Sequence, residues 1–398
     1  MKEYSMLKTG KAIASAWLMV SVSMIIRVYG LEEIVFFNKA AISLGVFFFG
    51  LWIFPHVYRH WQEEKRDFAI AYGMALALTF TELLGGAMRL EATRGGVSLG
   101  LKGILIIMAA SPVMAFVPEP FFYRILHMSL AQTTDEAFYK DHKIRPENRA
   151  FLLAWGILSI GYLLCLLAFY PGLYCYDMVW QWQQFAQWDF NTHHPLIHTL
   201  LSGGLFELGK ILGGSYNTGV LLYCVVQLLF LTGTKAYAIR FLVKQKTHMA
   251  LIFGTGLFFL LFPFFPVLSI STTKDIPFAG FFLLVFVGVC EMTAEKTFYR
   301  GPKLIFFLAC AVFMCLFRNN AVYGLGVMGL VLALAWAAAK WKRRDGRFLL
   351  KAIGLLIVCM AVTQFLFIAM EKGLQAKKGS KAEMMSLPMQ QMARSYVN

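Results

Sequence analysis

The sequence is short of charge, and that shortage excludes the ordinary soluble classes of protein. Only 15% of its 398 residues are Asp, Glu, Lys or Arg, whereas 59% are hydrophobic and the mean hydropathy is +0.62. Soluble domains contain roughly 25% charged and about 45–50% apolar residues. Because a backbone in lipid must satisfy its own hydrogen bonds, long apolar runs favour helices. We therefore expect an all-α polytopic membrane protein.

Cysteine pairs are also missing from the sequence. No two of the seven cysteines form a CxxC motif, and all except Cys175 lie inside apolar segments. This pattern predicts neither a disulfide framework nor a zinc site. The N-terminus has a basic start and an apolar run but no small-residue cleavage pattern, which indicates a retained first span.

Acidic residues are too few to balance the basic ones. The chain has 37 Lys and Arg against 22 Asp and Glu, a formal net charge of +15. Such a balance can indicate nucleic-acid binding, but these cations fall in short loops between apolar runs, as the positive-inside rule requires. We therefore expect contact with membrane lipids and no nucleic-acid partner.

Long apolar segments dominate what is present. A run of about 20 apolar residues crosses the roughly 30 Å hydrocarbon core of a bilayer. On this basis about eleven segments are predicted to span the membrane: 12–29, 34–54, 68–88, 101–119, 151–170, 218–240, 249–269, 276–293, 304–318, 321–339 and 352–370.

A twelfth segment, 196–213, is apolar but carries Glu207, Lys210 and several glycines. If it does not cross, thirteen Lys and Arg residues between positions 235 and 351 face the cytoplasm, and in the same stretch only Lys274 and Arg318 face outward. A crossing would reverse this arrangement and violate the positive-inside rule. We therefore predict an amphipathic helix that lies along the outer interface.

The same rule sets the predicted organisation of a multi-pass cell-membrane protein. The N-terminus is cytoplasmic and begins a four-span module at 1–119, and a cytoplasmic loop follows at 120–150. A larger transmembrane module covers 151–370 and includes an outer loop at 171–217. The tail at 371–398 is expected to be extracytoplasmic and to begin a tail or further domain.

The stretch from Tyr170 to His198 has no Lys or Arg, yet it carries two carboxylates, three histidines and three tryptophans. Titratable groups held against a membrane face are costly, so they indicate chemistry there. Asp177 is the candidate general base, since it lies just beyond the end of a span. It could instead cap the first helix of the loop, and the competitor Asp189 could belong to a turn.

His193 and His194 precede Pro195 at the start of the predicted interfacial helix. Imidazoles there could bind a phosphate, relay a proton or hold a metal, or they could simply make hydrogen bonds at a helix start. No His, Asp or Glu spacing here matches a strong metal motif, so we expect no cofactor, with a divalent metal as a weaker alternative. The three tryptophans are typical of an interfacial belt.

Two cationic clusters face the same predicted side. Lys274-Asp275 lies between two spans, and Arg318-Asn319 follows another. Cations and an amide at one membrane face suit the binding of a phosphate and the charge that develops on it. The alternatives are an ion pair between Lys274 and its neighbour Asp275, and snorkelling of Arg318 to lipid headgroups.

The order of these features resembles the glycosyltransferase C (GT-C) superfamily, and in particular the protein O-mannosyltransferases and aminoarabinose transferases. Members carry an acidic residue soon after a module's first span and a proline-containing juxtamembrane helix before the next crossing. Asp177 matches the acidic position, and His194-Pro195-Leu196 matches the helix start. The resemblance covers about 151–398; it lacks the usual acidic pair, because Met178 follows Asp177.

This resemblance implies an inverting membrane glycosyltransferase. The donor would be a polyprenyl-phosphate sugar and the acceptor an envelope glycan, lipid or protein. Asp177 would act as base with His194 beside it, and Asp189, His193, Lys274, Asp275, Arg318 and Asn319 would bind substrate. The competing hypothesis is a lipid-linked sugar flippase or a secondary transporter, which would place its polar site near the bilayer midplane, often between internal repeats.

Overall fold

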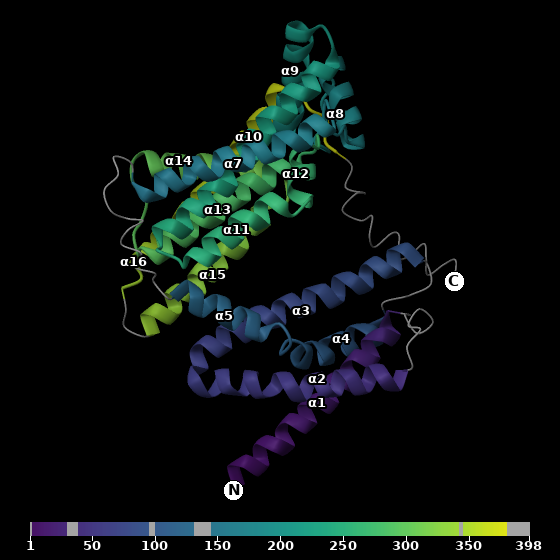
Figure 1. The fold of residues 1–398 in the computed structure, drawn as a ribbon. Coiled ribbons are helices and arrows are strands. Elements are labelled where there is room, and N and C mark those ends of the chain that lie inside the picture. The colour runs from purple at the N-terminus through teal and green to yellow at the C-terminus, as the bar shows by residue number, and fades with distance from the viewer. Residues whose placement is uncertain (1, 30–38, 95–99, 131–144, 342–344, 380–398) are drawn as a thin grey trace. The chain divides into compact units, whose positions relative to one another are not determined.

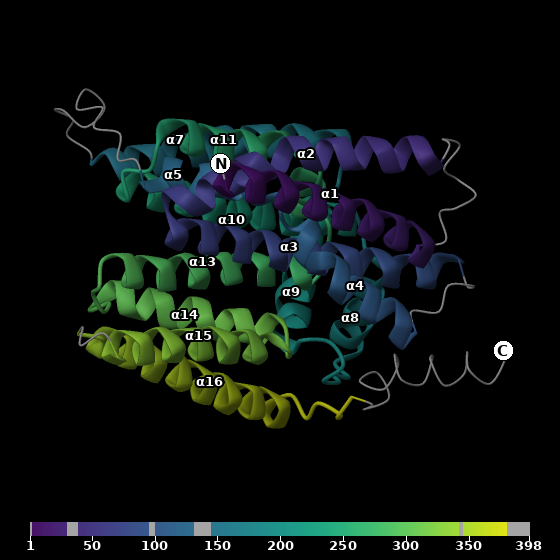
Figure 2. The same ribbon diagram turned by 90° about the horizontal axis from the view of Figure 1, so that it is seen from below.

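The computed structural model describes residues 2–29, 39–94, 100–130, 145–341 and 345–379, which fold into helices joined by turns (Figures 1 and 2). The chain divides into two compact units, Met1–Thr133 and Thr134–Asn398. Within the described residues, eight helices are long and apolar enough to cross a membrane, or nine if one bent pair counts as a single span. The prediction of a helical, multi-pass membrane protein is confirmed at this level.

The first unit contains five helices. Their bounds are α1 Lys2–Val28, α2 Lys39–Glu63, α3 Lys65–Arg94, α4 Leu101–Met114 and α5 Glu119–Leu130. Helix α1 packs on α2 and α4, and α3 packs on α4 and α5. Leu18, Phe54 and Val113 share one buried apolar cluster of this unit.

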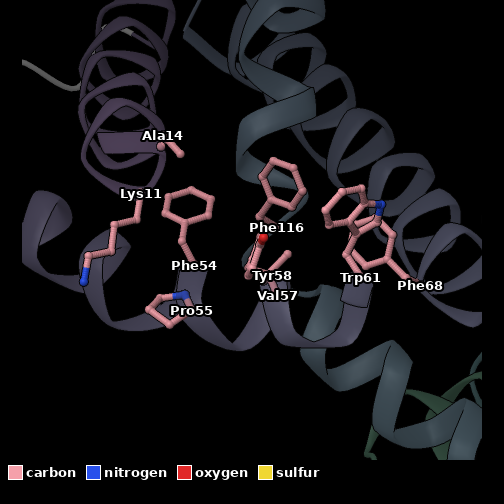
Figure 3. Close-up of a pocket in the computed structure, with 10 residues that line it drawn as sticks. Lys11, Ala14, Phe54, Pro55, Val57, Tyr58, Trp61, Phe68 and Phe116 are labelled. Carbon is pink, nitrogen blue, oxygen red and sulfur yellow. The ribbon is translucent and has the colours of Figure 1, made fainter. Parts of the chain in front are cut away.

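An apolar pocket of about 430 Å³ opens among α1, α2 and α3 (Figure 3). Phe54, Trp61 and Phe116 supply much of its wall, and Lys11 and Tyr58 contribute polar groups. Its lining includes no carboxylate and no imidazole, so we do not place the acid–base chemistry there.

Two predicted spans are interrupted, and proline explains both interruptions. In the predicted span 101–119 the helix α4 ends at Met114, and a bend of 51° at residues 115–118, which include Pro118, separates it from α5, which begins at Glu119. The segment 249–269 is split into α11 (Met249–Leu261) and α12 (Phe264–Ser269) because Phe262, which precedes Pro263, is extended. Proline disfavours the helical conformation in the residue that precedes it. Helix α5 also occupies part of the predicted loop at 120–150.

The second unit is built around α10. That helix is α10 Tyr216–Lys244. Besides α11 and α12, the other helices of this unit are α7 Pro146–Ala168, α8 Tyr176–Gln187, α9 Leu196–Gly213, α13 Asp275–Ala294, α14 Pro302–Phe317, α15 Ala321–Trp341 and α16 Arg347–Gly373. Helix α10 packs against α7, α9 and α13. In the most apolar stretch of α10, 61% of the residues are buried, against 17% in α7 and in α15. Helix α10 is therefore the inner helix, and the rest of the chain leaves most of the surface of the other two uncovered.

The short helices α8 and α9 lie at one end of this unit, beyond the long helices (Figure 1). Helix α9 contacts α10 at His198–Tyr223 and at Gly209–Gly219. These contacts are about 16 Å apart along α9 but only about 6 Å apart along α10, at 1.5 Å per residue. Helix α9 therefore crosses the start of α10 at a steep angle, and it is not among the candidate spans.

Candidate functional site

The start of α8 is fastened to the segment that precedes α13. Leu173 pairs with Ser271 as an isolated parallel bridge, and the Thr272 hydroxyl accepts a 2.9 Å hydrogen bond from the Cys175 backbone N–H. Helix α8 begins immediately after this pairing, with Cys175 as its N-cap. This pairing brings Asp177, in the first turn of α8, beside Lys274.

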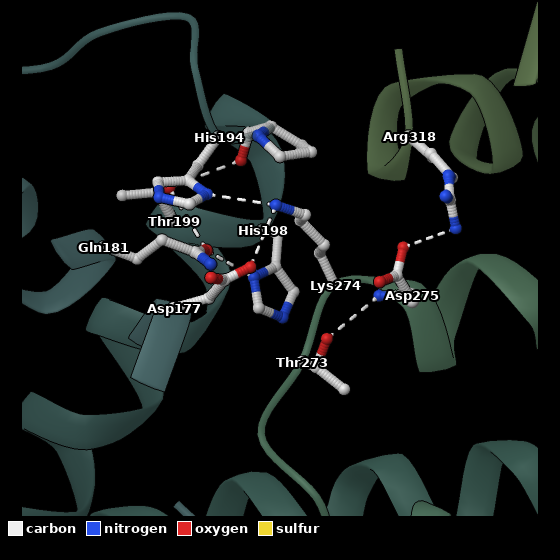
Figure 4. A network of polar contacts seen from close by, with 10 residues as sticks. Asp177, Gln181, His194, His198, Thr199, Thr273, Lys274, Asp275 and Arg318 are labelled. Atoms are coloured by element: carbon white, nitrogen blue, oxygen red, sulfur yellow. Dashed lines mark hydrogen bonds and ion pairs between the residues drawn. The ribbon is translucent and has the colours of Figure 1, made fainter. Parts of the chain in front are cut away.

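Lys274 is the centre of the resulting cluster (Figure 4). Its Nζ lies 3.1 Å from Asp177 Oδ2 and 3.1 Å from His194 Nδ1. An ammonium only donates hydrogen bonds, so Nδ1 of His194 must be the acceptor and the ring hydrogen is assigned to Nε2. Two side chains from separate parts of the chain thus share one lysine.

The cluster holds each group in a defined charge state. Burial, and next the charge of Lys274, lower the pKa of His194 to about 4, so the imidazole is neutral near pH 7. Burial alone would raise the pKa of Asp177, but the hydrogen bond and the charge of Lys274 outweigh it and the pKa is lowered. Asp177 is therefore an ionised carboxylate at neutral pH.

A polar pocket of about 430 Å³ opens onto this cluster. It is a concave site in the size range of small-molecule pockets. Helix α8, the loop that follows it and Lys274 form its wall: Tyr176, Asp177, Trp180, Gln183, Gln184, Gln187, Asp189, Asn191, His193, His194 and Lys274. Five predicted site residues therefore line one pocket.

The remaining predicted site residues form a neighbouring group. Arg318 donates to Asp275 at 2.6 Å, and Asn319 donates to the Thr192 carbonyl at 3.5 Å. The alternative of a local pair between Lys274 and Asp275 is wrong, because each pairs with a different partner. The alternative of Asp177 as a cap is also wrong, since Cys175 holds that position and Asp177 turns to Lys274.

The segment after α16 contacts the pocket wall at Asp189 and Asn191. Lys377 pairs with Asn191 as an isolated parallel bridge, and its Nζ lies 2.8 Å from Asp189 Oδ2. This contact joins the residues after α16 to the loop between α8 and α9. No local pattern in the sequence predicts this partner, because 188 residues separate the two side chains.

A buried hydrogen-bond chain lies beneath the cluster. His198 is fully buried; its Nδ1 contacts Gln181 Oε1 at 2.5 Å and its Nε2 contacts the Tyr223 hydroxyl at 2.7 Å. Tyr223 continues to Gln227, whose amide donates to the carbonyls of Ser269 and Ser271. The chain therefore joins α8, α9, α10 and the segment before Lys274.

Sequence reasoning missed this chain, although its spacing offers a signal. Gln181 lies four residues after Asp177, and His198 lies four residues after His194. Residues four apart on a helix share a face, so Gln181 lies one turn below Asp177 on α8; His198 lies in the first turn of α9, which begins just after His194. Among the described residues, no group of three His, Cys, Asp or Glu side chains is placed to hold a metal ion.

Comparison with known proteins gives a family but no activity. Residues 189–398 match a family of unknown function, DUF6020. No curated protein and no solved structure matches the chain. The matched region includes His194, Lys274 and Arg318 and begins after Asp177. Since it covers more than half of the sequence, the chain belongs to the DUF6020 family.

Proposed function

We propose that the protein is a membrane glycosyltransferase that moves a sugar from a polyprenyl-phosphate donor to a cell-envelope acceptor on the extracytoplasmic side. One observation carries the proposal: Asp177, His194 and Lys274 meet at a polar pocket at one end of the helical unit. The resemblance to the GT-C superfamily supplies the reaction class, and the cluster supplies candidate groups for it.

The ion pair between Lys274 and Asp177 is more typical of a reactive site than of a non-catalytic scaffold. The side chains of Lys274 and Asp177 are only 19% and 22% exposed, so both charges are partly withdrawn from water. Partial desolvation of a pair costs free energy that exposed charges would not lose. Perturbed pKa values of such groups in a cleft are typical of functional sites.

The proposed step is an inverting displacement. The hydroxyl oxygen of the acceptor attacks the anomeric carbon of the donor sugar and forms the new glycosidic bond. The bond from that carbon to the phosphate oxygen breaks, and polyprenyl phosphate leaves with the electron pair. The Asp177 carboxylate takes the hydroxyl proton, and the Lys274 ammonium stabilises the charge on the departing phosphate.

Lys274 gives this scheme an order of events. A donor phosphate that engages the ammonium competes with Asp177 for it. Loss of that hydrogen bond removes the contact that lowers the pKa of Asp177, so the carboxylate becomes a stronger base once the donor is bound. Lys274 lines the pocket and Arg318 does not, and we therefore assign the phosphate to Lys274 first.

The test is donor turnover by purified protein in lipid nanodiscs. A panel of polyprenyl-phosphate sugars is supplied, and release of polyprenyl phosphate is measured. We expect Asp177→Asn to lower the rate by about 100-fold or more, as for loss of a general base. Glu207→Gln is the matched control, because Glu207 bonds Tyr216 away from the pocket. Equal rates in the two variants would refute the assignment.

A second candidate, a lipid-linked sugar transporter, is favoured by one observation. Lys235 lies within the α10 span, is 7% exposed and is placed over the rings of Tyr162 and Phe265 at 5.4 and 5.3 Å. Phe265 belongs to α12, next to the break at Pro263, and transporters use broken helices around charged sites. A transporter should lose flux across proteoliposomes in Lys235→Met, whereas the transferase should keep its turnover.

A further inference from the structure

The open face of α8 carries a regular stripe of side chains. Tyr176, Trp180, Gln183 and Gln187 follow one another at spacings of four, three and four residues, which places them on one side of the helix. All four line the pocket and are exposed, Tyr176 at 81% and Trp180 at 60%. They extend the pocket away from Asp177 along about 15 Å of helix, at 1.5 Å per residue.

The opposite face of α8 accounts for the packing of the helix. Met178 and Gln181 are buried there, and Gln184, at the border between this face and the pocket wall, accepts a 2.9 Å hydrogen bond from the Asn191 backbone N–H. Trp182 packs edge-on against Tyr216 at 4.8 Å between ring centroids. The stripe is therefore not required to hold α8 in place.

The stripe also lacks charge, and the charges nearby are already paired. Asp177 is the sole charged residue of α8, and it is held by Lys274. Asp189, at the far end of the pocket, is held by Lys377. Among the described residues, an anionic ligand along the stripe would have to displace one of these pairs, whereas a neutral ligand would not.

The chemistry of the stripe matches a polyhydroxyl ligand. A glutamine amide both donates and accepts hydrogen bonds, as a sugar hydroxyl does. The indole face carries negative charge density and is apolar, so it stacks on the C–H-rich face of a sugar ring. An interfacial aromatic belt would explain Trp180, but it would not explain two glutamines in register with it inside a hollow.

We infer that this face of α8 is the acceptor subsite and that the acceptor is a neutral carbohydrate. Trp180 stacks against a sugar ring, Gln183 and Gln187 bind its hydroxyls, and the chain of sugars leads one hydroxyl to Asp177. The inference rests on the proposed function and deepens it, because it selects a glycan from among the glycan, lipid and protein acceptors. The length of the stripe fits an oligosaccharide rather than a single ring.

The experiment measures binding of the full-length protein in detergent to an array of neutral and acidic oligosaccharides. We expect wild-type protein to bind neutral oligosaccharides. Trp180→Ala should weaken the affinity about tenfold, the loss of one aromatic contact of about 1.4 kcal/mol, and Trp180→Phe should restore most of it. Trp188→Ala is the matched control, because Trp188, the C-cap of α8, is 64% exposed but is not part of the pocket wall.

Three results would overturn the subsite: no binding to neutral oligosaccharides, a preference for acidic ones, or equal losses in Trp180→Ala and Trp188→Ala. The assay of donor turnover separates this test from that of the proposed function, because it is run independently of the glycan array. Glycan binding without donor turnover would keep the subsite and reject the transferase. Donor turnover without glycan binding would keep the transferase and reject the subsite.

Discussion

Among the individual residues of the site, His194 and His198 carry imidazoles that are neutral because they are buried. Burial lowers the pKa of His198 to about 3 and is also the main cause of the pKa of about 4 at His194. A neutral His194 can accept the Lys274 hydrogen bond, and a neutral His198 lies between Gln181 and Tyr223 without adding a buried charge. Both groups protonate more readily in the unfolded chain, where a histidine pKa is about 6.5.

The sign of the pH dependence follows from those values. As the pH falls from 6.5 towards 4, the unfolded chain binds protons that the folded protein does not, so stability falls by at most about 1.4 kcal/mol per pH unit for each histidine. His198→Gln should be less stable at pH 7.5 by about 1–3 kcal/mol, because buried partners lose hydrogen bonds. It should also lose less stability in acid than the wild type.

Thermal unfolding in detergent at pH 7.5, 6 and 5 measures both effects. The wild type and His198→Gln should differ most at pH 7.5 and least at pH 5. Parallel curves for the two proteins would contradict the buried neutral state of His198.

At the scale of the element, the site depends on how closely α9 approaches its neighbours. A Cβ at Gly209 would lie 2.2 Å from the Gly219 Cα of α10, and a Cβ at Gly203 would lie 2.1 Å from the Phe185 ring of α8. Only glycine permits these approaches without displacement of a neighbour. The contacts fix α9, and with it His194 and His198, against α8 and α10.

Two alanine substitutions on α9 test this packing. Gly209→Ala forces a methyl group into the α10 backbone and should destabilise the protein by about 1–3 kcal/mol. Gly204→Ala meets no atom within 4 Å and should be neutral or stabilise by up to about 1 kcal/mol, because alanine favours the helix. The midpoint of thermal unfolding measures the difference, and equal effects of the two variants would show that α9 does not pack in this way.

The sequence predicts the helices of this region better than it predicts which side chains contact one another. The positions of Asp177, His194 and Lys274 at the ends of apolar runs marked them as candidates, and the α9 helix follows from its apolar pattern and from Pro195. The partner of Lys274 did not follow, because Asp275 is adjacent in sequence, and only the pairing of Leu173 with Ser271 brings Asp177 closer. The breaks at Pro118 and Pro263 could have been predicted from proline chemistry.

At the scale of the whole molecule, the spans bring distant segments to a common end. The loop after α7, the segment before α13, the end of α14 and the residues after α16 meet around the pocket, as the contacts of Asp177, Lys274, Asn319 and Lys377 require. In the proposed orientation this end faces outward. The opposite end of the unit carries a second ionic cluster, in which Glu291 pairs with Lys244 and Lys303.

The proposed function requires the Asp177 pocket to open to the extracytoplasmic side, where a lipid-linked donor and a glycan acceptor can meet. The direct test is labelling with a membrane-impermeant thiol reagent of a cysteine introduced at Gln187 in the pocket wall or at Lys246 in the turn after α10, each in a background in which all seven native cysteines are replaced. We predict that position 187 reacts in intact cells and position 246 only after the membrane is opened. Labelling of position 187 solely from the cytosol would contradict the account.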